Sequence, residues 1–489
     1  MLKGKEIQYY LAFKSKDVRF DGRFFVGVKS TGIYCRPVCR AKKPKEENCT
    51  FFETAAEAEQ AGFRPCLQCR PELAPGLAPV DSTAVLAQKA ARILEENCSE
   101  IENLQELAER LGCSDRHLRR AFATEYNVSP VQYMQTCRLL LAKSLLTDTG
   151  LSVLEAAMAA GFGSLRRFND LFLKQYHLSP TQLRKQATTE KNQFRDTITL
   201  KLGYRPPYMW KQILDFLSQR AIQGVEKVED GEYYRTVHHV NKDKKTVCGW
   251  IKVGNIESKN VLSLTVSASL ISVLPQVLSK VKRLFDLYCE PQTVYETLEI
   301  MNNIKENLCM LGIRLPGCFD DFELCVRAVL GQQITVKAAT TLAGRFVKTF
   351  GEPIETQIEG LCYTFPTPES LLELKGEINE YLGPLGIIST RAKTILELAR
   401  LFNVQKTELA MTLNPEEEIK KLTEIPGIGQ WTAQYIAMRA CGWADAFLET
   451  DHGVKKVLAP RTQKEILELA ESWRPFRAYA VMNLWNSLD

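Results

Sequence analysis

The chain has 489 residues, of which 45% are apolar and 25% charged, and its formal net charge is +5. This is the composition of a globular protein of about three domains, and it excludes a wholly disordered, collagen-like or acidic-tail protein. No apolar run reaches the ~18–20 residues of a membrane span, and the N-terminus has Lys and Asp where a secretory signal would be apolar. We therefore expect a soluble, cytoplasmic protein with no membrane partner.

The positive charge is concentrated near the N-terminus. Residues 1–75 carry the whole positive excess, and the rest of the chain balances to zero. Segments 71–83, rich in Pro, Gly and Ala, and 185–197, polar without an apolar period, are predicted linkers. They divide the chain into blocks at 1–75, 82–188 and 197–489, of which the first is expected to contact an acidic partner.

Two short-spaced cysteine pairs lie in the first block. They are Cys35 with Cys39 and Cys66 with Cys69. Four thiolates in this pairing suit a closed tetrahedral zinc site, and the spacing alone leaves open a purely structural site that stabilises a small module. Four other cysteines lack pair spacing and are predicted to be buried apolar residues: Cys49, Cys98, Cys113 and Cys137.

The sequence around these pairs resembles the N-terminal domain of the Ada family of adaptive-response regulators. The segments TGIYCRPVCRA and GFRPCLQC carry the resemblance. It implies that Cys35 is both a zinc ligand and the acceptor of a methyl group from a methyl phosphotriester in DNA. A zinc-bound thiolate is the nucleophile, and its methylation would remove a negative charge, strengthen binding to phosphates and switch on transcription.

A basic run follows Cys35 and is the expected path of the DNA backbone, with a solvated charged loop as the alternative. The predicted contacts are Arg36, Arg40, Lys42 and Lys43. Members of the Ada family also repair O6-methylguanine with a Pro-Cys-His-Arg site. No such motif occurs here, so that activity is not expected.

The second block contains an internal repeat. Equivalent positions in its two copies include Leu118 and Phe168, Phe122 and Phe172, and Tyr126 and Tyr176. Each copy has a helix, a turn with Gly112 or Gly161, and a second helix that Ser114 or Ser164 can cap. This pattern predicts two helix-turn-helix units, and a plain helical bundle with duplicated helices is the alternative.

The second helix of each copy would present side chains to base edges and phosphates. The predicted DNA-binding residues are Arg116, His117, Arg119 and Arg120, and then Arg166 and Arg167. The segments AAGFGSLRRFNDLF and YHLSPTQLRK resemble the AraC/XylS family of regulators. The resemblance implies activation of transcription from promoter DNA, and we expect double-stranded DNA and RNA polymerase as partners of a monomer.

The third block contains a helix-hairpin-helix pattern, LTEIPGIGQWTAQYIAMR, at 422–439. Gly427 and Gly429 would let backbone N–H groups of the turn approach a phosphate. A monovalent cation is a further candidate ligand of this turn. The alternative is a tight interhelical turn without a ligand.

Asp451 follows the hairpin, as in the helix-hairpin-helix glycosylase superfamily. The longer resemblance, over about 200–487, is to AlkA-type 3-methyladenine DNA glycosylases, in RPPYMW, RLPGCFDDFE, RAVLGQQ and FPTPESL. It implies a small α/β subdomain at 197–305, in which 261–270 alternates like a strand, and a helix-hairpin-helix glycosylase domain at 306–489. The predicted fold is thus multidomain and mainly α with α+β parts: a small zinc α/β domain, two tandem helix-turn-helix units and an AlkA-like glycosylase.

The glycosylase resemblance implies the roles of several residues. Asp451 would stabilise the cationic transition state as the N-glycosidic bond of an alkylated purine breaks. The flipped base would lie in an aromatic pocket that favours a cationic ring. The pocket residues carried over are Phe216, Trp431, Tyr435 and Phe476, the last of which stands for the family's Trp.

Two further positions bear on the mechanism. Trp431 occupies the position of the lyase members' Lys, so the enzyme is expected to be monofunctional, and the cysteine cluster of an iron–sulfur centre is missing. Gln333 stands where the family has an intercalating Leu, and a polar side chain is a weaker wedge.

The three blocks together predict a bifunctional alkylation-damage response protein. One alternative is a methylation-responsive regulator whose C-terminal block only binds DNA. Another is a repair enzyme without regulation, whose helix-turn-helix units only hold DNA.

Overall fold

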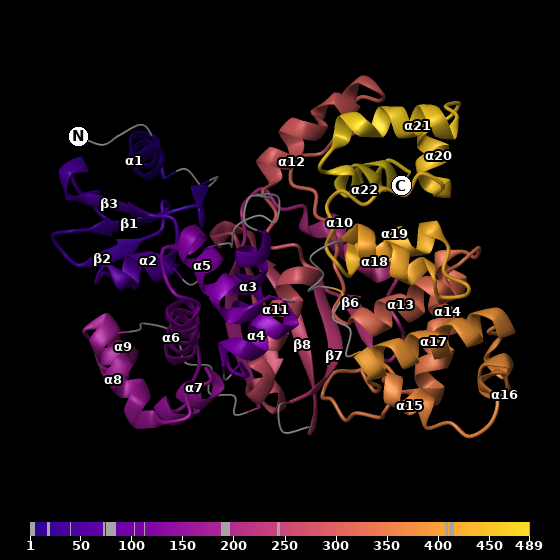
Figure 1. The fold of residues 1–489 in the computed structure, drawn as a ribbon, viewed down its shortest axis with the longest axis horizontal. Helices are drawn as coiled ribbons and strands as arrows, with labels where there is room; N and C mark the ends of the chain where they lie inside the picture. The colour runs from indigo at the N-terminus through magenta and orange to yellow at the C-terminus, as the bar shows by residue number, and fades with distance from the viewer. Residues whose placement is uncertain are drawn as a thin grey trace.

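The structure is a computed structural model. It describes residues 5–16, 20–39, 41–71, 74, 85–101, 103–111, 113–186, 196–241, 245–405, 409 and 415–488. The chain runs from the N-terminal elements at the left of Figure 1, through a central sheet, to helices at the right. Most of the predicted linker at 71–83, and much of that at 185–197, lies outside the described residues. Among the described helices, none is long and apolar enough to cross a membrane.

The N-terminal part is a small sheet with a helix packed against it. The sheet has the order β3-β1-β2-β4. Its elements are α1 (Lys5–Ser15), β1 (Phe25–Val28), β2 (Ile33–Cys35), β3 (Cys49–Phe52), α2 (Ala55–Gln60) and β4 (Arg64–Pro65). β2 and β4 are parallel, with Tyr34 opposite Pro65. Their carboxyl ends therefore meet at one edge of the sheet.

The next part is all helical and contains the predicted repeat. Its helices are α3 (Val85–Glu96), α4 (Leu104–Arg110), α5 (Asp115–Tyr126), α6 (Pro130–Asp148), α7 (Val153–Ala159), α8 (Leu165–Tyr176) and α9 (Pro180–Gln186). The two predicted caps are confirmed: the Ser114 hydroxyl accepts the His117 N–H at 3.3 Å, and that of Ser164 accepts the Arg167 N–H at 3.4 Å. Gly112 lies outside the described residues.

Gly161 shows why the turn of the second copy needs glycine. Its φ of +85° is in the left-handed region, and a Cβ there would lie 2.5 Å from Ser99 Cα. A side chain at this position would be strained in its backbone and would collide with the segment after α3. The turn therefore holds the second helix-turn-helix unit closely against the first.

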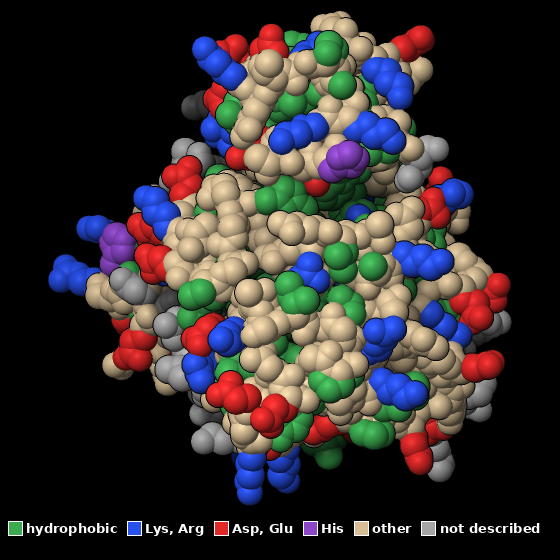
Figure 2. Space-filling view, turned by 90° about the vertical axis from the view of Figure 1, so that its right-hand side faces the viewer, with side chains coloured by type: hydrophobic (Ala, Val, Ile, Leu, Met, Phe, Trp, Pro, Cys, Tyr) green, Lys and Arg blue, Asp and Glu red, His purple; other side chains and the backbone are tan. Residues whose placement is uncertain are grey.

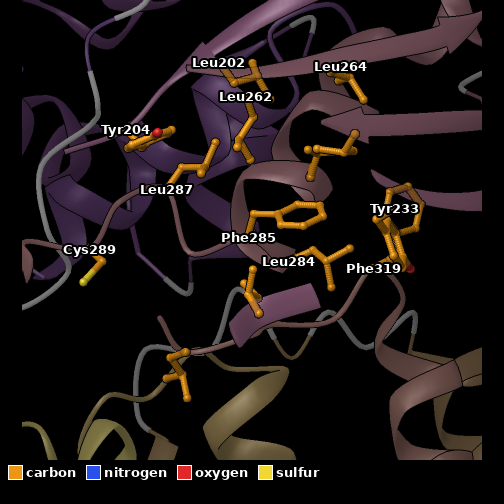
Figure 3. Packing of buried hydrophobic residues seen from close by; sticks show 14 of the residues in the cluster. Leu202, Tyr204, Tyr233, Leu262, Leu264, Leu284, Phe285, Leu287, Cys289 and Phe319 are labelled. Atoms are coloured by element: carbon orange, nitrogen blue, oxygen red, sulfur yellow. The ribbon is translucent and has the colours of Figure 1, made fainter. Parts of the chain in front are cut away.

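A five-stranded antiparallel sheet of order β5-β9-β8-β7-β6 forms the centre. Its elements are β5 (Thr197–Gly203), α10 (Trp210–Gln219), β6 (Glu226–Glu229), β7 (Glu232–Val240), β8 (Thr246–Ile256), β9 (Val261–Ser267), α11 (Leu274–Leu284) and α12 (Pro291–Leu298). The strand predicted within 261–270 is β9. Side chains of β5, β9 and the end of α11 share a buried core (Figure 3), which includes Leu202, Leu262, Leu264, Leu284 and Phe285.

The remaining helices surround the hairpin. They are α13 (Asp321–Leu330), α14 (Val336–Phe350), α15 (Pro368–Leu372), α16 (Ile378–Leu382), α17 (Ser389–Gln405), α18 (Pro415–Thr423), α19 (Gln430–Arg439), α20 (His452–Leu458), α21 (Gln463–Ala470) and α22 (Arg477–Asn486). One buried core joins α20 and α22 to the central sheet, and a second joins α13, α17 and α19. Figure 2 shows a hollow lined by hydrophobic side chains below the upper part of the molecule, where Figure 1 places α20 to α22.

Candidate functional sites

The four paired cysteines meet at the edge where β2 and β4 end. Cys35 is the last residue of β2, and Cys66 directly follows β4. The Cys66 N–H donates to the Tyr34 carbonyl at 3.0 Å, which continues the parallel pairing. Tight turns then return Cys39 and Cys69 to the same place, and the four sulfur atoms lie within 4.8 Å of one another. We call these four residues the cysteine cluster.

The cysteine cluster fits one Zn²⁺. A tetrahedral site with Zn–S bonds of about 2.3 Å needs sulfurs about 3.8 Å apart, which is within the observed spread. Three of the four side chains are buried and Cys69 is half-buried, as in a closed site. Hydrogen bonds among the thiols, first of all with Cys35, lower the pKa of Cys39 to about 7. The residues for one zinc ion are thus in place, as the spacing predicted.

Arg36 lies beneath the cysteine cluster and not on the surface, contrary to its predicted role as a DNA contact. Its guanidinium is buried and pairs through two nitrogens with Asp21, and it also donates to the Cys69 carbonyl at 3.2 Å. The Arg36 backbone N–H donates to Cys69 Sγ at 3.3 Å. An arginine next to a buried carboxylate is held there by charge, so Arg36 positions the loop of the cluster.

The other predicted basic contacts of this module differ in exposure. Lys42 is exposed, and Arg40 lies outside the described residues. Lys43 is half-buried, donates to the Cys39 carbonyl at 3.0 Å and places its ammonium 3.6 Å from the centre of the Phe13 ring. Burial lowers the pKa of Lys43. Lys42 is therefore the described member of the run that is open to a phosphate.

The helix-turn-helix residues lie as the pattern predicted. All six side chains are exposed on α5 and α8, while the opposite faces bury aromatic residues. The exposed set is Arg116, His117, Arg119, Arg120, Arg166 and Arg167. Within it, Arg119 forms an exposed ion pair with Asp115 at 2.8 Å, an interaction weak enough to exchange for a phosphate.

A buried carboxyl group joins the cysteine cluster to the second helix-turn-helix unit. Glu59 on α2 accepts hydrogen bonds from the hydroxyls of Tyr34 at 2.9 Å and Tyr176 at 3.4 Å. Tyr34 precedes Cys35 on β2, and Tyr176 is the last residue of α8. Burial raises the pKa of Glu59 to about 8. Around the contact, Asn127 donates to Glu57 at 2.7 Å and Arg70 donates to Asp148 at 2.7 Å.

The hairpin turn lies between α18 and α19 with Gly427 and Gly429 exposed. Gly427 has a φ of +91°, and a Cβ there would lie 2.1 Å from the Thr394 hydroxyl. That hydroxyl donates to the Pro426 carbonyl at 2.7 Å, so the turn is fixed to α17. The arrangement presents backbone N–H groups at the start of α19 to solvent, where a phosphate can bind.

Asp451 is held by three donors at the start of α20. Its Oδ1 accepts the Trp485 indole N–H at 2.9 Å and the Val454 backbone N–H at 3.1 Å. Its Oδ2 accepts the Trp431 indole N–H at 3.2 Å. Together these bonds fix the direction in which the carboxylate points. We call Asp451, Trp431, Tyr435, Phe216 and Trp485 the aromatic site.

The aromatic rings of this site form two stacks. Trp431 and Tyr435 are parallel, with centroids 5.3 Å apart, and Phe216 stacks on Trp485 at 6.4 Å. The Arg220 guanidinium lies 3.8 Å from the centre of the Phe216 ring, so that ring already has a cationic neighbour. Trp431 and Tyr435 are half-buried, and the Arg439 guanidinium lies 5.6 Å from the centre of the Tyr435 ring.

Arg439 contacts the aromatic site through Tyr435. It donates to the Tyr435 hydroxyl at 2.7 Å and to the carbonyls of Pro316 and Gly317. Burial alone would raise the pKa of Tyr435, but the charges of Arg439 and Arg220 outweigh it and lower that pKa. Neither arginine was singled out in the sequence, because arginines at helical spacing usually belong to a solvated face.

The structure corrects the place of Phe476. Phe476 is buried before α22, packs edge-on against Tyr479 at 5.9 Å and lines a cavity of about 600 Å³ that also borders Arg23 of the N-terminal module. The tryptophan that reaches Asp451 is Trp485, further along α22. A tryptophan of α22 therefore contacts Asp451, whereas Phe476 packs in the interior. The signal for this contact in the sequence is the Trp in the last helix.

Gln333 is exposed in the turn between α13 and α14, with a φ of 56°. A non-glycine residue in the left-handed region is unusual and often marks a functional turn. The neighbouring Gln332 donates to the Gly427 carbonyl at 2.8 Å and to the Thr432 hydroxyl at 3.1 Å. The turn with Gln333 therefore lies beside the hairpin.

Known families match the chain in the same order. The metal binding domain of Ada matches residues 8–72, and a helix-turn-helix domain matches 107–186. The AlkA N-terminal domain matches 199–320, and the HhH-GPD superfamily of base excision DNA repair proteins matches 326–471. These matches confirm the resemblances predicted from the sequence.

Similar proteins span the whole chain or parts of it. A probable bifunctional transcriptional activator/DNA repair enzyme AlkA of Mycobacterium tuberculosis is 32% identical, over 98% of this chain and 96% of its own length. DNA-3-methyladenine glycosylase 2 of Escherichia coli is 34% identical, over 58% of this chain and 95% of its own. The bifunctional transcriptional activator/DNA repair enzyme AdaA of Bacillus subtilis is 31% identical, over 37% of this chain and 83% of its own.

The fold and the two sites define a class of protein: a methylation-sensing, DNA-binding regulator joined to a helix-hairpin-helix DNA glycosylase. Its partner is double-stranded DNA. The chain belongs to the family of bifunctional Ada–AlkA transcriptional activators and DNA repair enzymes.

Proposed function

We propose that the N-terminal module removes the methyl group from a methyl phosphotriester of DNA. The Cys35 thiolate would attack the methyl carbon, an S–C bond would form, and the C–O bond would break with its electron pair leaving on the phosphodiester oxygen. Zinc, when bound, keeps the sulfurs of the cluster deprotonated. The thioether product is not easily cleared, so each protein molecule would react once.

The hydrogen bonds around the cluster favour Cys35 as the acceptor. Hydrogen bonds with other thiols, first of all with Cys35, lower the pKa values of Cys39 and Cys66, and backbone N–H groups of Ala41 and Cys69 lower them further. The Arg36 N–H donates to Cys69. Three sulfurs thus have a backbone donor in the described part of the chain, and Cys35 is the fourth. A hydrogen bond to a thiolate stabilises its charge and makes it a weaker nucleophile.

The same reaction would control transcription. Methylated Cys35 carries less negative charge, so the module would bind phosphates more tightly and bring α5 and α8 onto promoter DNA. We infer that the protein acts as a monomer and contacts RNA polymerase from the DNA. Footprinting of promoter DNA before and after methyl transfer, with and without polymerase, tests this step.

For the C-terminal half, we propose monofunctional excision of alkylated purines of the 3-methyladenine type. The observation that carries it is the carboxylate of Asp451, fixed by two indole N–H groups beside the parallel rings of Trp431 and Tyr435. A cationic base would stack on this platform, and Asp451 would stabilise positive charge as the glycosidic bond breaks. The residue two positions after Gly429 is Trp431 and not Lys, so water would be the nucleophile. The hairpin, with or without a monovalent cation, would hold the phosphate backbone.

One experiment tests both activities: DNA carrying labelled methyl groups is treated with the full chain, and the label is followed. Label bound to protein and lost in Cys35→Ala supports the methyl acceptor. Label released as free methylated purine and lost in Asp451→Asn supports the glycosylase. Label on protein without free base would leave a regulator whose C-terminal half only binds DNA.

A further inference from the structure

Helix α2 of the N-terminal module contacts the ends of both α5 and α8, but the two contacts differ. Asn127, the residue after α5, donates to Glu57 on α2 in an exposed hydrogen bond. Tyr176, the last residue of α8, donates to Glu59 on α2 in a buried one. Water readily replaces the partner of an exposed group, whereas a buried carboxyl keeps the partners that it has. The second helix-turn-helix unit is therefore held to the N-terminal module more firmly than the first.

Glu59 extends from α2 into the interior of the helix-turn-helix part. α2 packs between the small sheet and α6, the helix that joins the two units (Figure 1). The Glu59 side chain is buried, and Thr136 and Lys143 of α6 lie buried near its carboxyl, with Lys143 only 1% exposed. A buried polar cluster of this kind fixes its members, because each of them would lose an interaction that water cannot replace there.

The same carboxyl is one residue away from the cysteine cluster. Tyr34, which donates to Glu59, directly precedes Cys35 on β2, and both side chains are buried. β4 is paired with β2 and also contacts α8. A methyl group added at Cys35 has to be accommodated by its neighbours, because close-packed interiors have little free space and transmit small displacements. Tyr34 and β4 give such a displacement two routes to the end of α8.

We propose that Glu59 couples methyl transfer at Cys35 to the position of α8, so that methylation strengthens the DNA contact of the second helix-turn-helix unit more than that of the first. This inference rests on the proposed methyl transfer and adds a structural route to the effect of charge. Loss of negative charge acts on any phosphate near the cysteine cluster, whereas a shift of α8 acts on the DNA that Arg166 and Arg167 reach. Glu59 is a positioning residue, because its buried carboxyl acts through Tyr34 and Tyr176.

The test uses full-length variants with matched controls. Glu59→Ala removes the acceptor of both tyrosines, and Glu59→Gln keeps one. Tyr176→Phe removes one hydroxyl, and its control is Tyr126→Phe, since Tyr126 ends α5 at the equivalent position of the repeat and packs against Tyr133. Each protein is methylated with an oligonucleotide that carries methyl phosphotriesters, and mass spectrometry of the Cys35 peptide gives the extent of reaction.

Two measurements are made on each protein before and after methylation. Hydrogen exchange gives the protection of amides in α5 and α8 without DNA. Titration gives the affinity for a duplex that the methylated wild type selects from random sequence. Footprints locate the segments of this duplex under each unit, and each segment is then scrambled in turn.

In the wild type, we expect methylation to change amide exchange in α8 and not in α5, and to raise affinity mainly through the segment under α8. Glu59→Ala and Tyr176→Phe should lose about fivefold of this gain in affinity, which is typical of a coupling between two sites. Glu59→Gln and Tyr126→Phe should retain the gain, and the extent of methyl transfer should be equal in all four variants.

An undiminished gain in Glu59→Ala or, should that variant not fold, in Tyr176→Phe would overturn the proposal, because methylation would then act through charge alone. So would an equal loss in Tyr126→Phe and Tyr176→Phe, which would indicate a general loss of packing. If no methyl group reaches Cys35 in the wild type, the proposed function fails. Cys35→Met then supplies a thioether without reaction, and the same measurements on Cys35→Met with and without Glu59→Ala still decide the coupling.

Discussion

The cysteine cluster and the aromatic site are assembled over very different lengths of chain. The cluster takes its four sulfurs from residues 35–69, where one parallel strand pair and two tight turns bring them together. The aromatic site joins residues 216–485, and its parts come from α10, α19, the start of α20 and α22. A site of the first kind depends on local turns, whereas one of the second kind depends on how separate helices pack.

The largest expected effect is the loss of methyl transfer when Cys35 of the cysteine cluster is replaced. Cys35→Ala should abolish transfer of labelled methyl groups to protein, because the nucleophile is gone, and should leave base excision unchanged. Scintillation counting of protein after acid precipitation measures transfer. Cys49→Ala is the matched control, since Cys49 is buried in the same module outside the cluster.

Metal analysis of both variants separates loss of the acceptor from loss of zinc. If Cys35→Ala retains transfer, another cysteine is the acceptor.

The next effect concerns the carboxylate of the aromatic site. Asp451→Asn should lower single-turnover release of 3-methyladenine by about 100-fold or more, the usual cost of removing a preorganised electrostatic group. Methyl transfer should stay at the wild-type level. Glu449→Gln, two residues earlier, serves as control, and a rate for Asp451→Asn close to that control would rule out the proposed role.

A smaller effect distinguishes the two aromatic residues of the last helix region. Trp485→Phe keeps a ring but removes the N–H that Asp451 accepts, so excision should slow by about tenfold, in the range of one hydrogen bond to a charged group. Phe476→Leu should leave excision unchanged and lower the free energy of unfolding by about 1 kcal/mol through packing alone. Excision rates and urea unfolding measure the pair. Slower excision in Phe476→Leu than in Trp485→Phe would restore Phe476 to the pocket.

The smallest effect concerns the contact between the cysteine module and α8. Because the pKa of Glu59 is raised from its ordinary value of 4.5 to about 8, the native state favours the protonated carboxyl. The stability that the protonated Glu59 carboxyl adds to the native state is fully present below about pH 4.5 and is lost as the pH rises to about 8. Glu59→Gln keeps an acceptor for both tyrosines without a charge, so its melting temperature should equal that of wild type near pH 5 and exceed it by about 2–4 °C at pH 9.

Calorimetry at several pH values measures this difference. Glu46→Gln, at an exposed position of the same module, should show no such divergence. A constant offset between Glu59→Gln and wild type at all pH values would contradict the raised pKa.

The sequence alone predicted a metal site or a helix cap where the residues that form it lie close together in the chain. Cys35, Cys39, Cys66 and Cys69 follow a spacing that few other functions require, and turns of fixed length leave little freedom in where the sulfurs lie. The caps at Ser114 and Ser164 likewise depend on hydrogen bonds to backbone groups three residues away. The order of the modules could also be predicted from the sequence, because each module carries its own motif.

Only the tertiary structure decided which side chains complete each site. Arg36 is buried because Asp21, fifteen residues away, takes its guanidinium, and no local pattern shows that pairing. Trp485 reaches Asp451 because α22 packs on α20, whereas Phe476, just before the same helix, is buried. Local spacing determines caps, turns and metal ligands, whereas burial and long-range pairing depend on packing between elements that are distant in the chain.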